Sequence, residues 1–352
     1  MDYAKDLDSL VDLVMKEGAS DLHVSEGRFP VVRIAGELIP LSKHPAFDRS
    51  AMEKIIDFIL PPAKKELFKK RRGVDFAYVH GSERFRSHIF IQQGRICLAM
   101  RAIPKKIRTI SELSLPESIE FFARKHSGFF LVVGPTGHGK STTLASLVEI
   151  INQERLEHIV TIEDPIEYIF SPKKSIIDQR EIGDDTPDFH EALKDAFRED
   201  MDVIMIGEMR DAETMSAAVT AAETGHLVFA TLHTNSASST VDRIIDSFPP
   251  AQQNQIRIQL AASLSGIFSQ RLIPRVSGGL LPAYELLINN NAISNLIRDK
   301  RTHEIDTVVE TSSKEGMIDM NRCLVDLIRR GEVSIENAYL YSNNPKTLEK
   351  ML

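Results

Sequence analysis

The segment GPTGHGKSTT, residues 134–143, combines a glycine-rich turn with a lysine and hydroxyl side chains directly after it. Its spacing, Gly134-x4-Gly139-Lys140-Ser141, matches a phosphate-binding loop. An apolar run at 129–133 and a helical pattern after the loop supply the strand and helix that such a loop joins. Backbone N–H groups and the positive end of the helix would hold phosphate oxygens. Lys140 would reach the β- and γ-phosphates, and the Ser141 hydroxyl would ligate Mg²⁺.

This loop predicts a binding site for a nucleoside triphosphate. His138 stands where a small residue is common, and we expect its side chain to point to solvent. The residues expected to contact the nucleotide are those of the turn and of the helix start: Gly134, Pro135, Thr136, Gly137, His138, Gly139, Lys140, Ser141 and Thr142.

Two acidic positions follow short apolar runs and could support hydrolysis. Glu208 comes after the run Val203–Ile206, and Gly207 takes the place where an aspartate is common. Ligands of open α/β sheets lie at the carboxyl ends of the strands, so we expect Glu208 to hold Mg²⁺, through water. Glu163 ends another such run, where a carboxylate can orient and deprotonate the attacking water. The alternative for either acid is a helix cap or a surface ion pair.

Two histidines flank the apolar run 227–232. His226 and His233 are seven residues apart and would point to opposite faces of a regular strand, so we do not expect them to share one task. His233, at the carboxyl end, could sense or polarise the γ-phosphate. A histidine satisfied by hydrogen bonds within the core is the alternative for both.

The composition narrows the class of protein. The 352 residues suffice for two domains with cores of their own, and the net charge of −7 argues against a surface that coats nucleic acid. No window approaches the roughly 18 apolar residues of a membrane span, and the acidic N-terminus is not a signal peptide. Cys97 and Cys323 stand far apart, which indicates a reducing cytoplasm and neither a zinc site nor a disulfide framework.

The order of the patterns predicts two domains. An amphipathic helix through Leu7 and Val14 precedes a strand-rich stretch that reaches about residue 101. Linker composition follows, so we predict a first domain at 1–103, a linker at 104–115 and a second domain at 116–352. Ser114 and Thr186 are each expected to cap a helix.

The second domain is predicted to be of the α/β class. Its apolar runs alternate with helical patterns, which is typical of a parallel sheet covered on both faces. The runs expected to form strands lie at 129–133, 158–162, 203–206 and 227–232.

Four segments carry a family resemblance. GPTGHGKSTT, TIEDPIEY, VIMIGEMRDAET and TAAETGHLVFATLHTNSA resemble, in order and spacing, the Walker A, Asp, Walker B and His boxes of the secretion ATPase superfamily, the GspE/PilT family. The likeness covers most of residues 18–300. Within the superfamily, the chain is most similar to the retraction ATPases that power twitching motility of type IV pili.

The resemblance implies a PAS-like α+β domain followed by a RecA-like P-loop domain, closing into a homohexameric motor that hydrolyses ATP with Mg²⁺. Family nucleotide sites are completed by arginines of the N-terminal domain, which match Arg84, Arg86 and Arg101 here; surface charge on a strand is the alternative for them. The same match makes Glu163 the general base, Glu208 the Walker B acid and metal ligand together with Ser141, and His233 the His-box histidine.

The implied location is the cytoplasm, at the inner-membrane face, docked on a pilus platform protein, with no membrane insertion and no nucleic acid. Assembly ATPases usually add an N-terminal domain and a four-cysteine zinc motif, so retraction is favoured. AISNLIRD at 292–299 resembles the signature AIRNLIRE but departs from it at Ser294 and Asp299.

Several alternatives stay open. The chain could be the main retraction motor or an accessory paralogue that partners another pilus ATPase, and a type II secretion or pilus assembly ATPase is a further candidate. A regulator that binds ATP with little turnover is motivated by Ser294 and His138. A nucleic-acid translocase is disfavoured by the acidity, the absence of tryptophan and a total of only six tyrosines.

Overall fold

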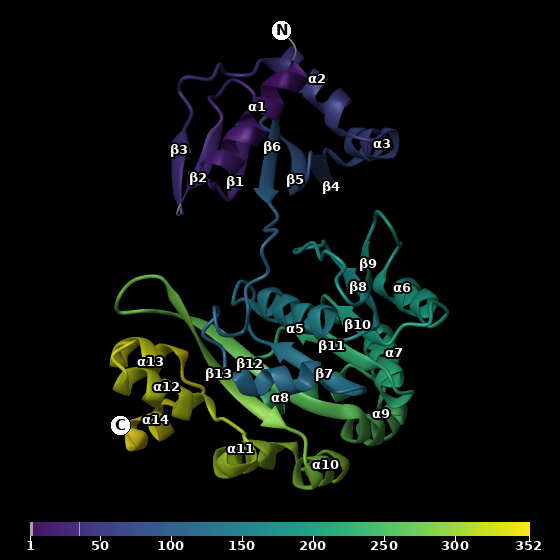
Figure 1. Ribbon diagram of the computed structural model, residues 1–352, viewed down its shortest axis with the longest axis vertical. Coiled ribbons are helices and arrows are strands. Elements are labelled where there is room, and N and C mark those ends of the chain that lie inside the picture. The colour runs from purple at the N-terminus through teal and green to yellow at the C-terminus, as the bar shows by residue number, and fades with distance from the viewer. Residues whose placement is uncertain (1–2, 35) are drawn as a thin grey trace. The chain divides into compact units, whose positions relative to one another are not determined.

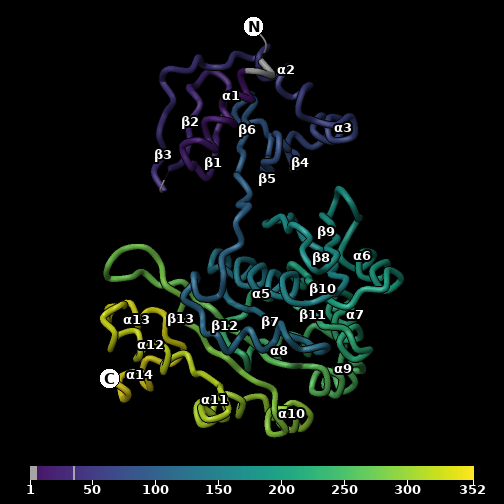
Figure 2. The backbone as a smooth tube through the Cα atoms, in the orientation of Figure 1, coloured from purple at the N-terminus to yellow at the C-terminus, as the bar shows by residue number. Residues whose placement is uncertain are grey.

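The computed structural model describes residues 3–34 and 36–352; residues 1, 2 and 35 of the predicted first domain lie outside the described residues. The chain divides into two compact units, Met1–Lys105 and Lys106–Leu352. Figure 1 labels most elements of each unit, and Figure 2 follows the backbone through them. In the part of the chain that is described, no helix has both the length and the hydropathy needed to cross a bilayer.

The first unit is a six-stranded antiparallel sheet with helices on one face. Its strand order is β3-β2-β1-β6-β5-β4. Side chains of α1 and α2 form one core with alternate residues of the strands, among them Phe85 and Ile89. The predicted first helix is confirmed. The elements are α1 (Tyr3–Lys16), β1 (Asp21–Ser25), β2 (Val31–Ile34), β3 (Glu37–Pro40), α2 (Arg49–Ile59), α3 (Pro62–Arg71), β4 (Gly73–His80), β5 (Glu83–Gln92) and β6 (Arg95–Ala102).

The second unit is built on a seven-stranded sheet of order β13-β12-β7-β11-β10-β8-β9. Every neighbouring pair is parallel except β12 with β13. The four predicted strand runs are confirmed as β7, β8, β10 and β11. The strands are β7 (Gly128–Val133), β8 (His158–Glu163), β9 (Ile176–Glu181), β10 (Val203–Ile206), β11 (Leu227–Leu232), β12 (Leu264–Pro274) and β13 (Leu280–Ile288).

Helices cover both faces of this sheet, as the α/β class requires. Alternate strand residues pack into one core with α6 to α11, and the others into a second core with α4 and α5. The last three helices pack on β12 and β13, where Figure 1 shows them grouped at the C-terminus. The helices are α4 (Glu120–Ala123), α5 (Lys140–Glu154), α6 (Phe189–Ala196), α7 (Ala212–Glu223), α8 (Ala237–Asp246), α9 (Pro250–Ser263), α10 (Asn291–Arg298), α11 (Ile305–Thr311), α12 (Met320–Arg329), α13 (Ile335–Tyr341) and α14 (Pro345–Met351).

Two predicted helix caps are wrong. Ser114 has a positive φ of 57°, and the chain continues from Pro116 into a 3-10 turn without a side-chain cap. Helix α6 is capped by Asp188, whose carboxylate accepts the N–H of Glu191 at 2.9 Å. Thr186 instead pairs with Ile182 in an isolated bridge, which holds its backbone outside the helix.

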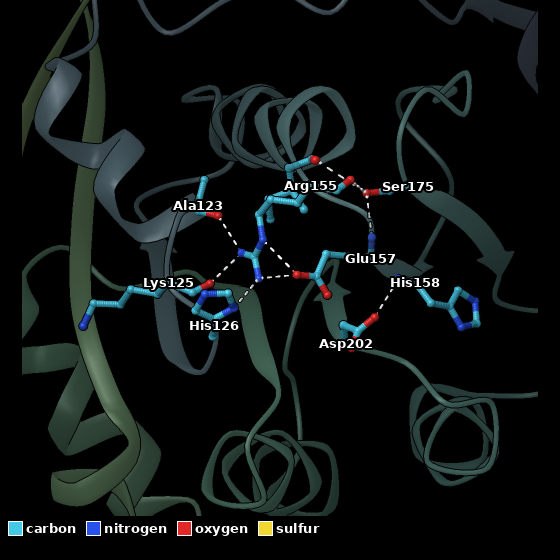
Figure 3. A network of polar contacts seen from close by, with 9 residues as sticks. Ala123, Lys125, His126, Arg155, Glu157, His158, Ser175 and Asp202 are labelled. Atoms are coloured by element: carbon cyan, nitrogen blue, oxygen red, sulfur yellow. Dashed lines mark hydrogen bonds and ion pairs between the residues drawn. The ribbon is translucent and has the colours of Figure 1, made fainter.

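Arg155 ties together loops at the amino ends of the parallel strands (Figure 3). Its Nη1 donates to the carbonyls of Ala123 at 2.9 Å and Lys125 at 2.6 Å, just before β7. Its Nε and Nη2 donate to Glu157, just before β8, at 3.0 and 2.6 Å. The Ser175 hydroxyl donates to the Arg155 carbonyl at 2.8 Å. This clasp lies at the edge of the sheet opposite to the phosphate loop, so its role is in folding stability.

Arg155→Met is therefore expected to lower the free energy of unfolding by about 2–4 kcal/mol, because it leaves Glu157 and two carbonyls without their partner in a largely buried place. Urea unfolding monitored by circular dichroism measures this. Arg124→Met is the matched control: it breaks the more exposed pairs of Arg124 with Glu120 and Glu154 and should cost less than about 1 kcal/mol. Equal losses in the two variants would contradict the assignment.

Candidate nucleotide-binding site

The phosphate loop leaves the carboxyl end of β7 and wraps around the head of its own lysine. Gly134, Gly137 and Gly139 have φ of 145°, 81° and 83°, values that glycine adopts without strain. Lys140 opens α5, is only 7 % exposed, and donates from Nζ to the carbonyls of Gly134 at 2.9 Å and Pro135 at 3.0 Å. Burial lowers the pKa of Lys140, against the opposing influence of nearby carboxylates. The ammonium is thus held at the centre of the loop.

The loop is pressed against β12, and Gln270 holds it there. A Cβ on Gly134 would lie 2.2 Å from the Gln270 carbonyl oxygen, so only glycine allows this approach. The Gln270 side chain donates from Nε2 to the His138 carbonyl at 2.9 Å and accepts the Thr143 hydroxyl at 2.6 Å. Gln270 was not among the predicted residues. The polar residues SQR between the apolar pairs of the segment GIFSQRLIP are the sequence signal that could have found it.

The expectation that His138 points to solvent is wrong. Its ring is half-buried, and its Nδ1 accepts the backbone N–H of Leu272 at 2.8 Å. The reason is that β12 continues past the end of β7, where its backbone groups need new partners.

His233 connects the loop lysine to Glu208. The Lys140 ammonium donates to His233 Nδ1 at 3.3 Å, so the ring proton sits on Nε2, which donates to Glu208 at 3.0 Å. The hydroxyl of Thr136 also lies 3.3 Å from Nδ1. His226, at the other end of β11, bonds to the Ala221 carbonyl at 3.0 Å instead. The structure therefore brings His233, Lys140 and Glu208 together and leaves His226 out.

Arg210 is a further charged group at this place, and it lies within the GEMRD segment. Its guanidinium forms an ion pair with Glu208 and lies 3.7 Å from Asp164. Burial raises the pKa of Glu208, but hydrogen bonds from Arg210 and His233 outweigh burial and hold the pKa below its ordinary value. Glu208 is therefore ionised at neutral pH.

Glu163 ends β8 at the same edge of the sheet and is 5 % exposed. Burial raises the pKa of Glu163 to about 7, although hydrogen bonds from Thr161, the Glu167 backbone and Gln179 oppose this. Thr161 donates at 2.8 Å and Gln179 at 3.3 Å, which fixes the orientation of the carboxylate. A carboxylate with a pKa near neutrality has the value that a general base needs.

The three predicted arginines lie in the first unit, on the face of its sheet opposite to the helices. Arg84 and Arg86 share that face of β5, and Arg86 stands directly opposite Arg101 of β6. Arg101 donates from Nε to Asp21 at 2.8 Å. Burial raises the pKa of Asp21, but hydrogen bonds from Ser20 and Arg101 lower it further than burial raises it. Asp21, which sequence reasoning missed, thus anchors Arg101, and the Arg101 side chain remains exposed.

The predicted metal ligands, Ser141 and Glu208, are hard oxygen donors of the kind that Mg²⁺ prefers. The described residues contain no group of three His, Cys, Asp or Glu side chains arranged to hold a metal. This is compatible with Mg²⁺ at a nucleotide site, because Mg²⁺ there takes one or two protein oxygens and completes its shell with phosphates and water. Both Glu208 oxygens already hold partners, so contact through water fits this side chain better than direct ligation.

A glycine loop, a buried lysine and carboxylates at the carboxyl edge of a parallel sheet define a P-loop nucleotide-binding α/β protein. The model of the Type II/IV secretion system protein family matches residues 3–279. This chain belongs to that family.

Similar proteins are known over nearly the whole length. The type IV pilus retraction ATPase PilT of Pseudomonas aeruginosa is 41 % identical over 334 residues, which cover 95 % of this chain and 97 % of that protein. The type IV pilus ATPase PilU of the same species is 36 % identical over 349 residues, 99 % of this chain and 91 % of PilU. The crystal structure of the pilus retraction motor PilT with bound ADP has a TM-score of 0.92 at 44 % identity, covering 98 % of this chain and 99 % of that one.

The contact between the loop and β12 can be tested with two glycines of the same loop. Gly134→Ala places a Cβ against the Gln270 backbone and is expected to weaken ADP binding at least about 100-fold, because the loop must move away from β12. Gly137 has a positive φ, but a Cβ added there would meet nothing within 4 Å. Gly137→Ala should therefore add backbone strain of about 1–2 kcal/mol, which is present with and without ADP, and should weaken ADP binding much less than Gly134→Ala does. Isothermal calorimetry measures both, and equal losses would contradict the argument.

Proposed function

We propose that this chain is a Mg²⁺-dependent, ATP-hydrolysing motor subunit that drives retraction of type IV pili. The observation that carries hydrolysis is the continuous contact from Lys140 through His233 to Glu208, with Glu163 at the same sheet edge. The pilus assignment rests on the full-length similarity to PilT.

The side chains are proposed to divide the chemistry as follows. When a nucleotide binds, the Lys140 ammonium would leave the carbonyls of Gly134 and Pro135 and donate to phosphate oxygens that the loop holds at the same place. Glu163 accepts a proton from the attacking water. Mg²⁺, held by Ser141 and through water by Glu208, would neutralise charge on the β- and γ-phosphates. His233 touches both the lysine and Glu208, so it is suited to report the presence of the γ-phosphate.

The arginines support a proposal about assembly. Two of the three are exposed and lie on one sheet face, where Arg86 and Arg101 stand opposite each other. We infer that Arg84, Arg86 and Arg101 complete a nucleotide site in a homohexamer of PAS-like and RecA-like domains joined by the linker 104–115. Guanidinium groups brought in by domain closure would stabilise charge on the transferred phosphoryl group and couple hydrolysis to motion. The motor would work in the cytoplasm, on the membrane platform protein.

The similarity to PilU over 99 % of the chain favours a second candidate, an accessory retraction motor that works with a paralogous ATPase. Ser294 bears on this choice. Its hydroxyl lies 2.9 Å from the Ala261 carbonyl and 3.1 Å from Asn289, and the side chain is buried. The position that carries arginine in the retraction signature therefore contributes packing here and not charge.

A strain that lacks this gene separates these functions. Excess, non-retracting pili without twitching indicate the main retraction motor, near-normal twitching indicates an accessory one, and bald cells indicate assembly.

Complementation should restore twitching with the wild type but not with Lys140→Ala or Glu208→Ala, and the two purified variants should hydrolyse ATP at least about 100-fold more slowly. Equal hydrolysis rates in all three proteins would remove the mechanism.

The pKa of Glu163 predicts the pH dependence of hydrolysis. A general base must be ionised, so kcat/KM is expected to rise with pH through about 7 and to level off above it. Glu163→Gln should lower kcat by about 100- to 10,000-fold and remove the rise, with ADP affinity little changed. Because the folded pKa lies above the unfolded value, Glu163 lowers the stability of the fold progressively as the pH rises from the ordinary pKa of a glutamate to about 7, and by a constant amount above that. The same variant removes this loss, so its gain in stability over the wild type should grow through this range and level off above about pH 7. Steady-state rates and urea unfolding at several pH values measure both effects.

A further inference from the structure

Strand β12 extends beyond the phosphate-loop strand and runs alongside the loop. The parallel pairing of β12 with β7 ends at Ser269 opposite Val133, while β12 continues to Pro274. Residues 270–274 therefore lie between the loop on one side and β13 on the other. This overhang places the side chains of Gln270 and Arg271 and the backbone N–H of Leu272 next to the nucleotide site.

His138 fills the place of the missing strand neighbour. Its Nδ1 accepts the Leu272 N–H, which requires a neutral ring with the proton on Nε2. The ring also lies edge-on to Tyr341 of α13, with centroids 6.5 Å apart and planes at 62°. Burial lowers the pKa of His138, and the nearby charges of Lys140 and Arg271 lower it further. The loop is thereby in contact with the last helices of the chain.

Arg271 makes the second connection, on the side of the loop that follows β11. Its guanidinium donates to the Tyr341 carbonyl, to Asn343 Oδ1 and, at 3.4 Å, to the Asn235 carbonyl. Asn343 itself donates to that carbonyl at 3.5 Å, and the Ser269 hydroxyl does so at 3.1 Å. Asn235 is two residues beyond His233, so these bonds hold the segment that carries the His-box histidine.

This arrangement is an unfavourable way to pack a helix. Burial lowers the pKa of Arg271, and its Nε is buried without a hydrogen-bond partner in the described part of the chain. A buried donor without a partner lowers the stability of the fold, so an apolar side chain would hold α13 at lower cost. The geometry thus favours a role in the site over a role in stability alone.

We propose that Tyr341–Asn343, the C-terminal strap, is a positioning element of the nucleotide site, acting on the phosphate loop through His138 and on the His-box segment through Arg271 and Asn235. The inference rests on the proposed function only in assuming that the loop binds a nucleotide. Linkage makes the effect reciprocal: if the strap raises nucleotide affinity, then bound nucleotide must stabilise the strap by the same factor.

Nucleotide affinity of full-length variants tests the proposal. Asn343→Ala, at an exposed position, and Arg271→Met are each expected to raise the Kd for ADP about fivefold or more, the lower end of ordinary coupling. Asn343→Ala added to Arg271→Met should have little further effect, because the two side chains act through one contact. Arg275→Met is the matched control: it breaks the ion pair of Arg275, the residue after β12, with Glu332 in the segment between α12 and α13, and should leave the Kd unchanged.

The contact made by His138 can be tested separately, through ADP affinity at several pH values. The charges and rings that face His138 are Lys140 of α5, Arg271 of β12 and Tyr341 of α13. His138→Leu should weaken ADP binding to a similar extent. Because the pKa of His138 is lowered, the wild type should keep its affinity at the ordinary histidine pKa of about 6.5 and lose it only at lower pH, where a protonated ring cannot accept the Leu272 N–H. His138→Asn, which keeps an acceptor that does not titrate, should recover most of the affinity and lose this pH dependence.

Hydrogen exchange tests the reciprocal effect. Amides of residues 335–345 should exchange at least about fivefold more slowly with saturating ADP in the wild type, and this protection should disappear in Arg271→Met. One outcome would overturn this inference and leave the proposed function intact. In it, the wild type binds ADP without protection of the strap, and Asn343→Ala and Arg271→Met bind ADP with unchanged affinity. A wild type that does not bind ADP would instead overturn the proposed function.

Discussion

The close approach of the phosphate loop to the backbone of β12 is the constraint on which the site depends. Because Gly134 has no Cβ, the chain can leave β7 against the Gln270 carbonyl and still turn into α5. That turn places the Lys140 ammonium inside the loop and puts the backbone of residues 138–139 within reach of the Gln270 side chain. A side chain at Gly134 would separate the two strands at the place where the nucleotide is expected, so this contact decides whether the loop has its shape.

The charged groups at this edge of the sheet lie in different surroundings. Lys140 is buried among carbonyls, Glu208 is ionised between Arg210 and His233, and Glu163 is kept near its titration point by burial. Three groups within one sheet edge thus differ in protonation because their surroundings differ. This separation suits an arrangement in which one acid holds charge and another exchanges a proton, with His233 connecting the lysine to the first of them.

The last helices of the chain contact the segments that form this site. Arg271 and His138 connect residues 341–343 to the two segments that surround the lysine. Those residues lie beyond the 3–279 that the family model matches. A coupling located there would let related motors share one catalytic edge while differing in how tightly they hold nucleotide. It would also give the C-terminal region a way to sense whether nucleotide is bound.

The sequence by itself determined the phosphate loop, the four central strands and the α/β class, because each rests on a local pattern: glycine spacing, short apolar runs and helical periodicity. The rule that ligands meet the carboxyl ends of parallel strands also placed Glu163, Glu208 and His233 at one edge, while their roles remain proposals. Only the tertiary structure decided the surroundings of His138, the parts played by Gln270, Arg210 and Asp21, and the true cap of α6. Their partners are mostly distant in the chain, as with His138 and Leu272, 134 residues apart, and no local pattern encodes a hydrogen bond across such a separation.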